Sequence, residues 1–181
     1  KEVDEILREL EELVKEIKKR LEELTREVKR LVDKIHKDNE DNLRDMARLV
    51  EEIKEIIRRG NKSSDVLKDI EKKAEESKKH LDESMKEARD LIRELEEKVK
   101  EILKEAERLI RRVKDLIRKT VKSKEVERVE RDVERLLDEL RRVVKEVLDR
   151  IRRLLEELER SSKRVKEETE RLVKEVREAA K

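Results

Sequence analysis

The sequence contains no proline, cysteine, tryptophan, tyrosine or phenylalanine, and only one glycine. Without cysteine there is no disulfide framework and no thiol chemistry. A single glycine excludes a glycine-rich loop that binds phosphate. The missing aromatic residues are unusual for a chain of 181 residues, because aromatic side chains bury the largest area in natural cores. The chain therefore uses a restricted set of residue types.

The sequence also lacks long apolar runs and an excess of charge of one sign. No apolar run approaches the ~20 residues that a membrane-spanning helix needs. No signal-peptide pattern opens the chain, so no compartment is predicted. The 53 basic residues are balanced by 51 acidic ones, with no basic block. We therefore expect neither nucleic acid nor a membrane surface as a partner.

The residues that are present favour long helices. Charged residues make up 57% of the chain and hydrophobic residues 34%. Disorder requires low hydrophobicity together with unbalanced charge, and the charge here is balanced. The apolar third is mainly leucine, isoleucine and valine at regular spacing, which is typical of long helices. The predicted fold class is all-α.

The first interruption of the periodic pattern lies at residues 59–65. Gly60 suits the left-handed residue that follows a helix C-terminus. Ser63 or Ser64 suits the N-cap of the next helix, and Asp65 would complement the dipole of that helix. This segment therefore predicts a tight turn between two helices.

The second interruption lies at residues 119–124. Thr120 and Val121 are β-branched and disfavour helix, and Ser123 can cap the helix that follows. The two interruptions predict helices of about 1–59, 64–119 and 123–181. Each would be about 85 Å long at 1.5 Å per residue. Because short loops make consecutive helices antiparallel neighbours, we expect one domain over 1–181, an elongated antiparallel up-down-up three-helix bundle.

The apolar stripe of the first predicted helix advances by alternating steps of four and three residues. Its members are Val3, Leu7, Leu10, Val14, Ile17, Leu21, Leu24, Val28, Leu31, Ile35, Asn39, Asn42, Met46, Leu49, Ile53 and Ile56. This near-heptad pattern predicts left-handed packing, and breaks such as Leu31–Ile35–Asn39 and Leu91–Leu95–Val99 predict that the supercoil is weak. Val50 and Ile57 widen the stripe toward a second neighbour.

These features together resemble those of a known group of proteins. The Leu/Ile/Val stripe, the Glu/Lys/Arg surface, the three equal helices and the Gly-Asn-Lys-Ser-Ser-Asp turn at 60–65 are similar to those of computationally designed, parametrically generated helical bundles of the three-helix coiled-coil type. The resemblance covers the whole chain. It implies a scaffold, a switch or a test of design rules.

Polar residues enter the stripe in one zone of each predicted helix. They are His36, Asn39, Asn42, Ser77, His80, Ser84, Ser161 and Ser162. Folding the chain at its two turns brings all of them to one level, within about one helical turn. They could form a buried hydrogen-bond layer that sets the register. They could instead face water at the flank, or form a functional pocket or a pH switch through His36 and His80.

Residues 37–42 leave a second alternative open, because they are poor helix formers and could act as a hinge. The stripe continues through them after one break, which favours an unbroken helix.

The candidate chemistry is sparse. His36 and His80 are predicted to lie about 10 Å apart along the bundle, too far to share a metal ion. No serine, histidine and buried acid form a plausible triad. We therefore predict no enzyme activity, cofactor, metal or small-molecule substrate. The predicted function is a structural scaffold, and the alternative is an interaction module, either a homo-oligomer or a switch component. We expect a monomer, with self-association possible.

Overall fold

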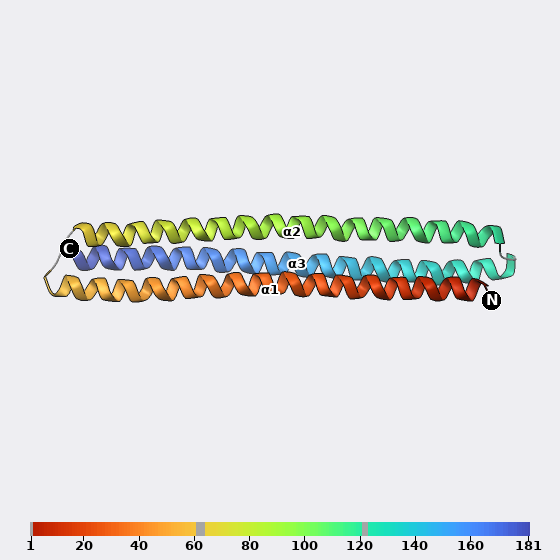
Figure 1. The fold of residues 1–181 in the computed structure, drawn as a ribbon, viewed down its shortest axis with the longest axis horizontal. Coiled ribbons are helices and arrows are strands. Elements are labelled where there is room, and N and C mark those ends of the chain that lie inside the picture. The colour runs from red at the N-terminus through yellow and green to blue at the C-terminus, as the bar shows by residue number, and fades with distance from the viewer. Residues whose placement is uncertain (1, 61–63, 121–122) are drawn as a thin grey trace. The chain divides into compact units, whose positions relative to one another are not determined.

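The structure, a computed structural model, describes residues 2–60, 64–120 and 123–181. All regular secondary structure among these residues is helical: α1 (Glu2–Arg58), α2 (Ser64–Thr120) and α3 (Ser123–Ala180) (Figure 1). The predicted all-α, three-helix fold is confirmed, and the observed helix bounds lie within about one residue of the expected ones. The proposed cap Ser63 and the helix-disfavouring residue Val121 lie outside the described residues.

Gly60 ends α1 in the conformation that its position in the sequence predicts. The N–H of Arg59 donates to the Glu55 carbonyl at 3.1 Å, and the N–H of Gly60 donates to the Ile57 carbonyl at 3.0 Å. The backbone of Gly60 has a φ of 94°. This left-handed region is open to glycine at no steric cost and disfavours residues that carry a Cβ.

Replacing Gly60 by alanine is expected to lower the free energy of unfolding by about 1 kcal/mol. A Cβ built at this position has no heavy atom within 4 Å, so the cost would come from the backbone conformation alone. Gly60→Asn should cost less, because asparagine tolerates the left-handed region better. Guanidinium unfolding of the three proteins checks the order, and equal stability of all three would contradict the assignment.

The helices pack into two compact units. Unit 1 comprises Lys1–Val28 and Ile92–Arg153, and unit 2 comprises Lys29–Leu91 and Leu154–Lys181. Each helix contributes one segment to each unit. The predicted single domain over 1–181 stays a prediction.

Each unit has an apolar core to which all three helices contribute. The core cluster of unit 1 consists of Leu10, Ile110, Ile117, Val129, Val133 and Leu137. The core cluster of unit 2 consists of Met46, Val50, Ile53, Ile57, Ile70, Ala74, Val173 and Val176. Leucine, isoleucine and valine dominate both cores, as the composition predicts, and burial of this apolar area is the main source of stability.

The ion pairs between helices show the relative directions of neighbouring helices within each unit. In unit 2, residues further along α2 pair with residues that come earlier in α3. The three pairs are Glu71–Arg177, Lys78–Glu170 and Asp82–Lys166. In unit 1, Glu107 pairs with Arg141 and Arg118 with Glu130, in the same sense. In the ion pairs between α1 and α3, by contrast, the residue numbers of both helices rise together, from Glu40–Arg164 to Lys54–Glu175. In unit 1 the α1–α3 pairs Asp4–Arg128 and Lys18–Glu139 show the same rise, so within each unit α2 runs opposite to α3, and α1 runs with α3.

The structure corrects the phase of the predicted stripe. Val50 and Ile57, which were expected only to widen it, are buried, whereas Leu49 is half-buried and Ile56 exposed. Similarly, Val32 and Ile92 are buried in place of the expected Leu31 and Leu91. An α-helix has 3.6 residues per turn, so a strict heptad row drifts by about 20° per repeat. The core therefore moves to the next residue as the row rotates away from it.

The possible hinge at 37–42 lies inside α1, which continues through it as helix. The apolar residues on either side, Val32 and Met46, are both buried, so the packed face supports the helix where propensity is weak.

Candidate functional site

The predicted polar residues all belong to unit 2, but they are not equally buried. Asn39 and Ser162 are buried, with 1% and 4% of their surface exposed. Asn42, Ser77, Ser84, His36 and Ser161 are half-buried. His80 is exposed, which corrects the prediction that it belongs to a buried layer. Its neighbour Leu81 faces the core instead, and His80 therefore points away from it.

Two contacts between α1 and α3 mark the level of the buried polar residues. The Nδ1 atom of His36 lies 2.9 Å from the Ser161 hydroxyl oxygen, within hydrogen-bonding distance. One turn further along α1, Glu40 accepts a hydrogen bond from the Arg164 guanidinium at 2.6 Å. Asn39 lies between His36 and Glu40, and Ser162 lies between Ser161 and Arg164. Asn39 and Ser162 therefore stand at the same level on adjacent helices.

The two buried polar residues have uncompensated hydrogen-bonding groups. The Nδ2 atom of Asn39 and the Oγ atom of Ser162 are buried and have no hydrogen-bond partner. A buried polar group without a partner costs about 1–3 kcal/mol. The only hydrogen bond that joins two of the eight predicted residues, within the described ranges, is the one between His36 and Ser161.

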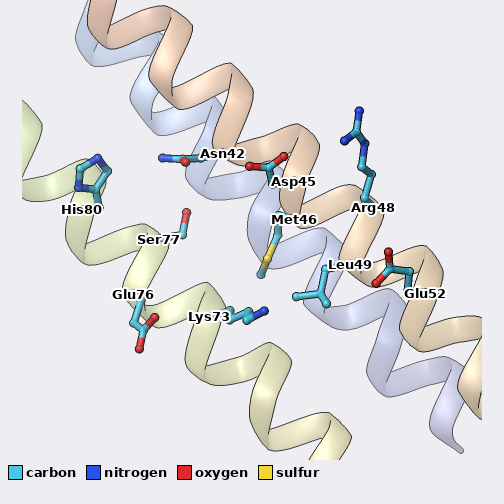
Figure 2. Close-up of a pocket in the computed structure, with 10 residues that line it drawn as sticks. All are labelled: Asn42, Asp45, Met46, Arg48, Leu49, Glu52, Lys73, Glu76, Ser77 and His80. Atoms are coloured by element: carbon cyan, nitrogen blue, oxygen red, sulfur yellow. The ribbon is translucent and has the colours of Figure 1, made fainter.

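Three of the predicted residues line a groove between α1 and α2. Figure 2 shows Asn42, Met46 and Leu49 on α1 facing Ser77 and His80 on α2. The groove has a volume of about 700 Å³, and charged residues of both helices form its rim. The predicted layer thus divides into a buried part between α1 and α3 and a groove part between α1 and α2.

Two buried polar residues were missed by the sequence prediction. Thr25 and Thr169 have 7% and 1% of their surface exposed. The hydroxyl of each donates to the carbonyl four residues earlier, Leu21 at 2.9 Å and Val165 at 2.8 Å. Both side chains are therefore satisfied within their own helix. Their spacing of four from a core residue was the available signal, because threonine can occupy an apolar position in this way.

Ion pairs join α3 to its neighbours and shift some ionisation equilibria. The hydrogen bond from Lys78 to Glu170, at 2.8 Å, and the positive charge of Lys78 hold the pKa of Glu170 below its usual value. The hydrogen bond to Glu175 raises the pKa of Lys54, and the hydrogen bond to Glu130 raises the pKa of Arg118. Each shift favours the charged, paired form over the neutral one.

The lowered pKa of Glu170 predicts a small pH-dependent stability. The Lys78–Glu170 pair should contribute above the pKa of the unfolded carboxyl, and the contribution should disappear as the pH falls through the folded pKa. In Lys78→Gln the titration midpoint of Glu170, followed by NMR, should rise toward its ordinary value. Lys79→Gln is the control, because Lys79 is exposed. An unchanged midpoint in Lys78→Gln would contradict the assigned cause.

Among the described residues, no three His, Asp or Glu side chains lie close enough together to hold a metal ion. None of the helices in the described ranges is long and apolar enough to span a membrane.

Comparisons with known proteins agree with the fold. No protein-family model matches the chain. No curated protein matches it either. A solved structure titled "Computationally designed three helix bundle" is similar over 99% of this chain and 92% of its own, with a TM-score of 0.62 and 17% sequence identity. At this identity the likeness is one of fold. The chain is an all-α protein with the three-helix bundle fold, as its resemblance to designed bundles implied.

Proposed function

We propose that this chain is a designed structural scaffold, whose function is to hold its own three-helix fold. The observation that carries the proposal is that its buried side chains form apolar cores shared by all three helices. The fold of the similar designed bundle and the restricted residue set support a designed origin. Burial of leucine, isoleucine and valine at native-like spacing is sufficient to specify such a fold.

We further propose that the buried part of the polar layer sets the register of α1 against α3. A polar side chain in an apolar stripe costs stability in every register, but least where it meets other polar groups. Asn39 and Ser162 stand at one level, next to the hydrogen-bonded pair of His36 and Ser161. A shift by one heptad would place Asn39 opposite Leu155 in one direction and opposite Thr169 in the other, and the Thr169 hydroxyl already donates to the Val165 carbonyl. The layer would thus disfavour the shifted packing.

The register proposal is tested with a variant that carries Asn39→Leu and Ser162→Ala. The original chain should give one set of backbone amide signals in a two-dimensional NMR spectrum. The variant should give more than one set, because its uninterrupted apolar stripe admits alternative registers. Thr169→Val is the control, since Thr169 is buried but bonded within its own helix. A single set of signals from the variant would contradict a register-setting role.

The scaffold proposal itself is tested by heating. We expect the helical circular dichroism signal to persist above the ordinary mesophile range of about 45–65 °C, because all three helices contribute to both apolar cores and the connections are short. A midpoint inside that range would argue against a scaffold role. Small-angle X-ray scattering tests the elongated single domain that the sequence predicts, for which a length of about 85 Å is expected.

A further inference from the structure

Asn42, Leu49 and Ser77 line the groove between α1 and α2 in unit 2, and each belongs to a row of residues spaced by seven that continues along its helix beyond the groove. On α1 the row is Asn42, Leu49 and Ile56, and on α2 it is Ser77, Ser84 and Leu91. Residues seven apart stay on one face of a helix. The other members of the rows are half-buried, whereas Ile56 and Leu91, which lie beyond the lining of the groove, are 38% and 41% exposed. Leu109 and Leu116 in unit 1 are at least as exposed, so exposure alone does not distinguish this flank, and its charges and polar groups have to do so.

The flank between α1 and α2 also differs from the other two flanks in its charges. Within the part of the chain that the structure describes, the interhelical ion pairs all have one partner on α3, as in Lys54–Glu175 and Lys78–Glu170. No ion pair there closes the flank between α1 and α2. Among the described residues, the charged rim of the α1–α2 groove is therefore not closed by ion pairs, unlike the two flanks of α3.

The rim of this groove carries charges that are not used in the described ion pairs. Asp45, Arg48 and Glu52 line it on α1, and Lys73 and Glu76 line it on α2. Both helices alternate in sign along the rim. A partner of one sign would meet repulsion at part of the rim, whereas a surface with the same alternation can match it throughout.

We propose that the α1–α2 groove of unit 2 is a self-association surface that binds the same groove of a second copy of this chain. In a two-fold symmetric contact, each surface meets an identical one, so a patch must be complementary to itself. Two helices packed against two helices would bury both residue rows in a four-helix core. The net charge of +2 keeps the repulsion between two copies small.

The polar residues of the groove fit the same arrangement. Asn42, Ser77 and His80 each offer a donor and an acceptor, and no hydrogen bond within the described ranges uses their side chains. In the symmetric contact, Asn42 of one copy would face Ser77 or His80 of the other, and reciprocally. Each groove thus contains the donors and the acceptors that the same groove of a second copy would need. This inference goes beyond the scaffold proposal and rests on different residues from those of the buried layer.

The test is the mass of the full chain in solution, measured by light scattering over roughly a hundredfold range of concentration. We expect the mass to rise from 22.0 kDa, the mass of one chain, to about twice that value. The variant with Ile56→Glu and Leu91→Glu should remain at the mass of one chain throughout. Both residues are more than one-third exposed, so glutamate should not disturb the fold of the single chain.

A matched control carries Leu109→Glu and Leu116→Glu, which make the same change at two exposed leucines of unit 1. This control should still dimerise. A chain that is monomeric at every concentration would overturn the proposal. Loss of the dimer in the control variant would overturn it as well, because association would then not be specific to this groove.

A charge exchange gives an independent readout. Arg48→Glu should weaken the dimer at least about tenfold, because it places like charges across the rim of the contact. Adding Glu76→Arg should restore most of the affinity, since in a symmetric contact each change is matched by the other copy. Failure of the second change to restore association would contradict the proposed pairing of the two rims.

Discussion

Replacement of Leu140 by alanine is expected to lower the free energy of unfolding by about 2–5 kcal/mol. Leu140 lies on α3 in unit 1 and is fully buried. Truncation would remove several buried methyl and methylene groups and leave a cavity that rigid, long helices cannot easily close. The measurement is guanidinium-induced unfolding, which extends to proteins too stable to melt by heat alone.

The matched control for this prediction is Leu116→Ala. Leu116 belongs to the same unit, but 55% of its surface is exposed. The same chemical change there should alter the free energy of unfolding by no more than about 0.5 kcal/mol. Equal losses in the two variants would show that Leu140 is not part of a tightly packed core. A large loss in Leu116→Ala alone would indicate that the exposed leucine is covered in solution.

Joint replacement of Asn39 by leucine and Ser162 by alanine is expected to raise the free energy of unfolding by about 1–3 kcal/mol. The Nδ2 atom of Asn39 and the Oγ atom of Ser162 are buried without partners, so removing them abolishes a desolvation penalty. Leucine has the same number and branching of side-chain heavy atoms as asparagine, so the change in packing should be small. Asn39→Leu alone should give a smaller rise, because Ser162 would keep its uncompensated hydroxyl.

The control for the polar pair is Thr169→Val, which is also nearly isosteric and lies in the same unit. The Thr169 hydroxyl already donates to the Val165 carbonyl, so its removal should leave the stability unchanged or lower it by up to about 1 kcal/mol. The signs of the two changes are therefore expected to differ. A fall in stability in Asn39→Leu would mean that Asn39 has a bonding partner in solution, contrary to the expectation.

The single-residue tests have a wider meaning for the proposed function. If the buried polar pair costs stability and its removal admits other registers, then the pair exchanges stability for uniqueness of the fold. The variant with Asn39→Leu and Ser162→Ala tests both points. Its unfolding measures the stability cost of the polar pair, and the number of NMR signal sets shows how many helix registers are populated. The groove variants at Ile56 and Leu91 touch neither residue, so the self-association proposal can fail while the register proposal stands.

The helices themselves followed from the sequence alone. Gly60, the only glycine of the chain, predicts the end of α1 because few other residues accept a positive φ, and the structure places it at 94°. The β-branched pair at 120–121 marks the end of α2 without any glycine. Regular apolar spacing between these points leaves helix as the structure that gathers the apolar residues on one face.

The detailed core was decided only by tertiary packing. The sequence pattern could not distinguish Leu49 from Val50, or Leu91 from Ile92, because adjacent apolar residues fit a heptad row almost equally well. The choice depends on how far each helix rotates toward its two neighbours, and this rotation is a property of all three helices together. Adjacent residues lie about 100° apart, so a drift of about 20° per heptad exchanges the buried and the exposed residue once it has accumulated over several heptads.

Helix rotation also explains why the eight predicted polar residues differ in burial. The sequence places eight polar residues at one level, since helix rise and two turns suffice for that estimate. Whether a side chain faces α3, the groove or water depends on rotation about the helix axis, where one residue corresponds to about 100°. Asn39 and Ser162 are consequently buried, Asn42 and Ser77 line the groove, and His80 is exposed. The position of a residue along the helix axis follows from the local sequence. The direction in which its side chain points depends on the neighbouring helices against which the helix packs.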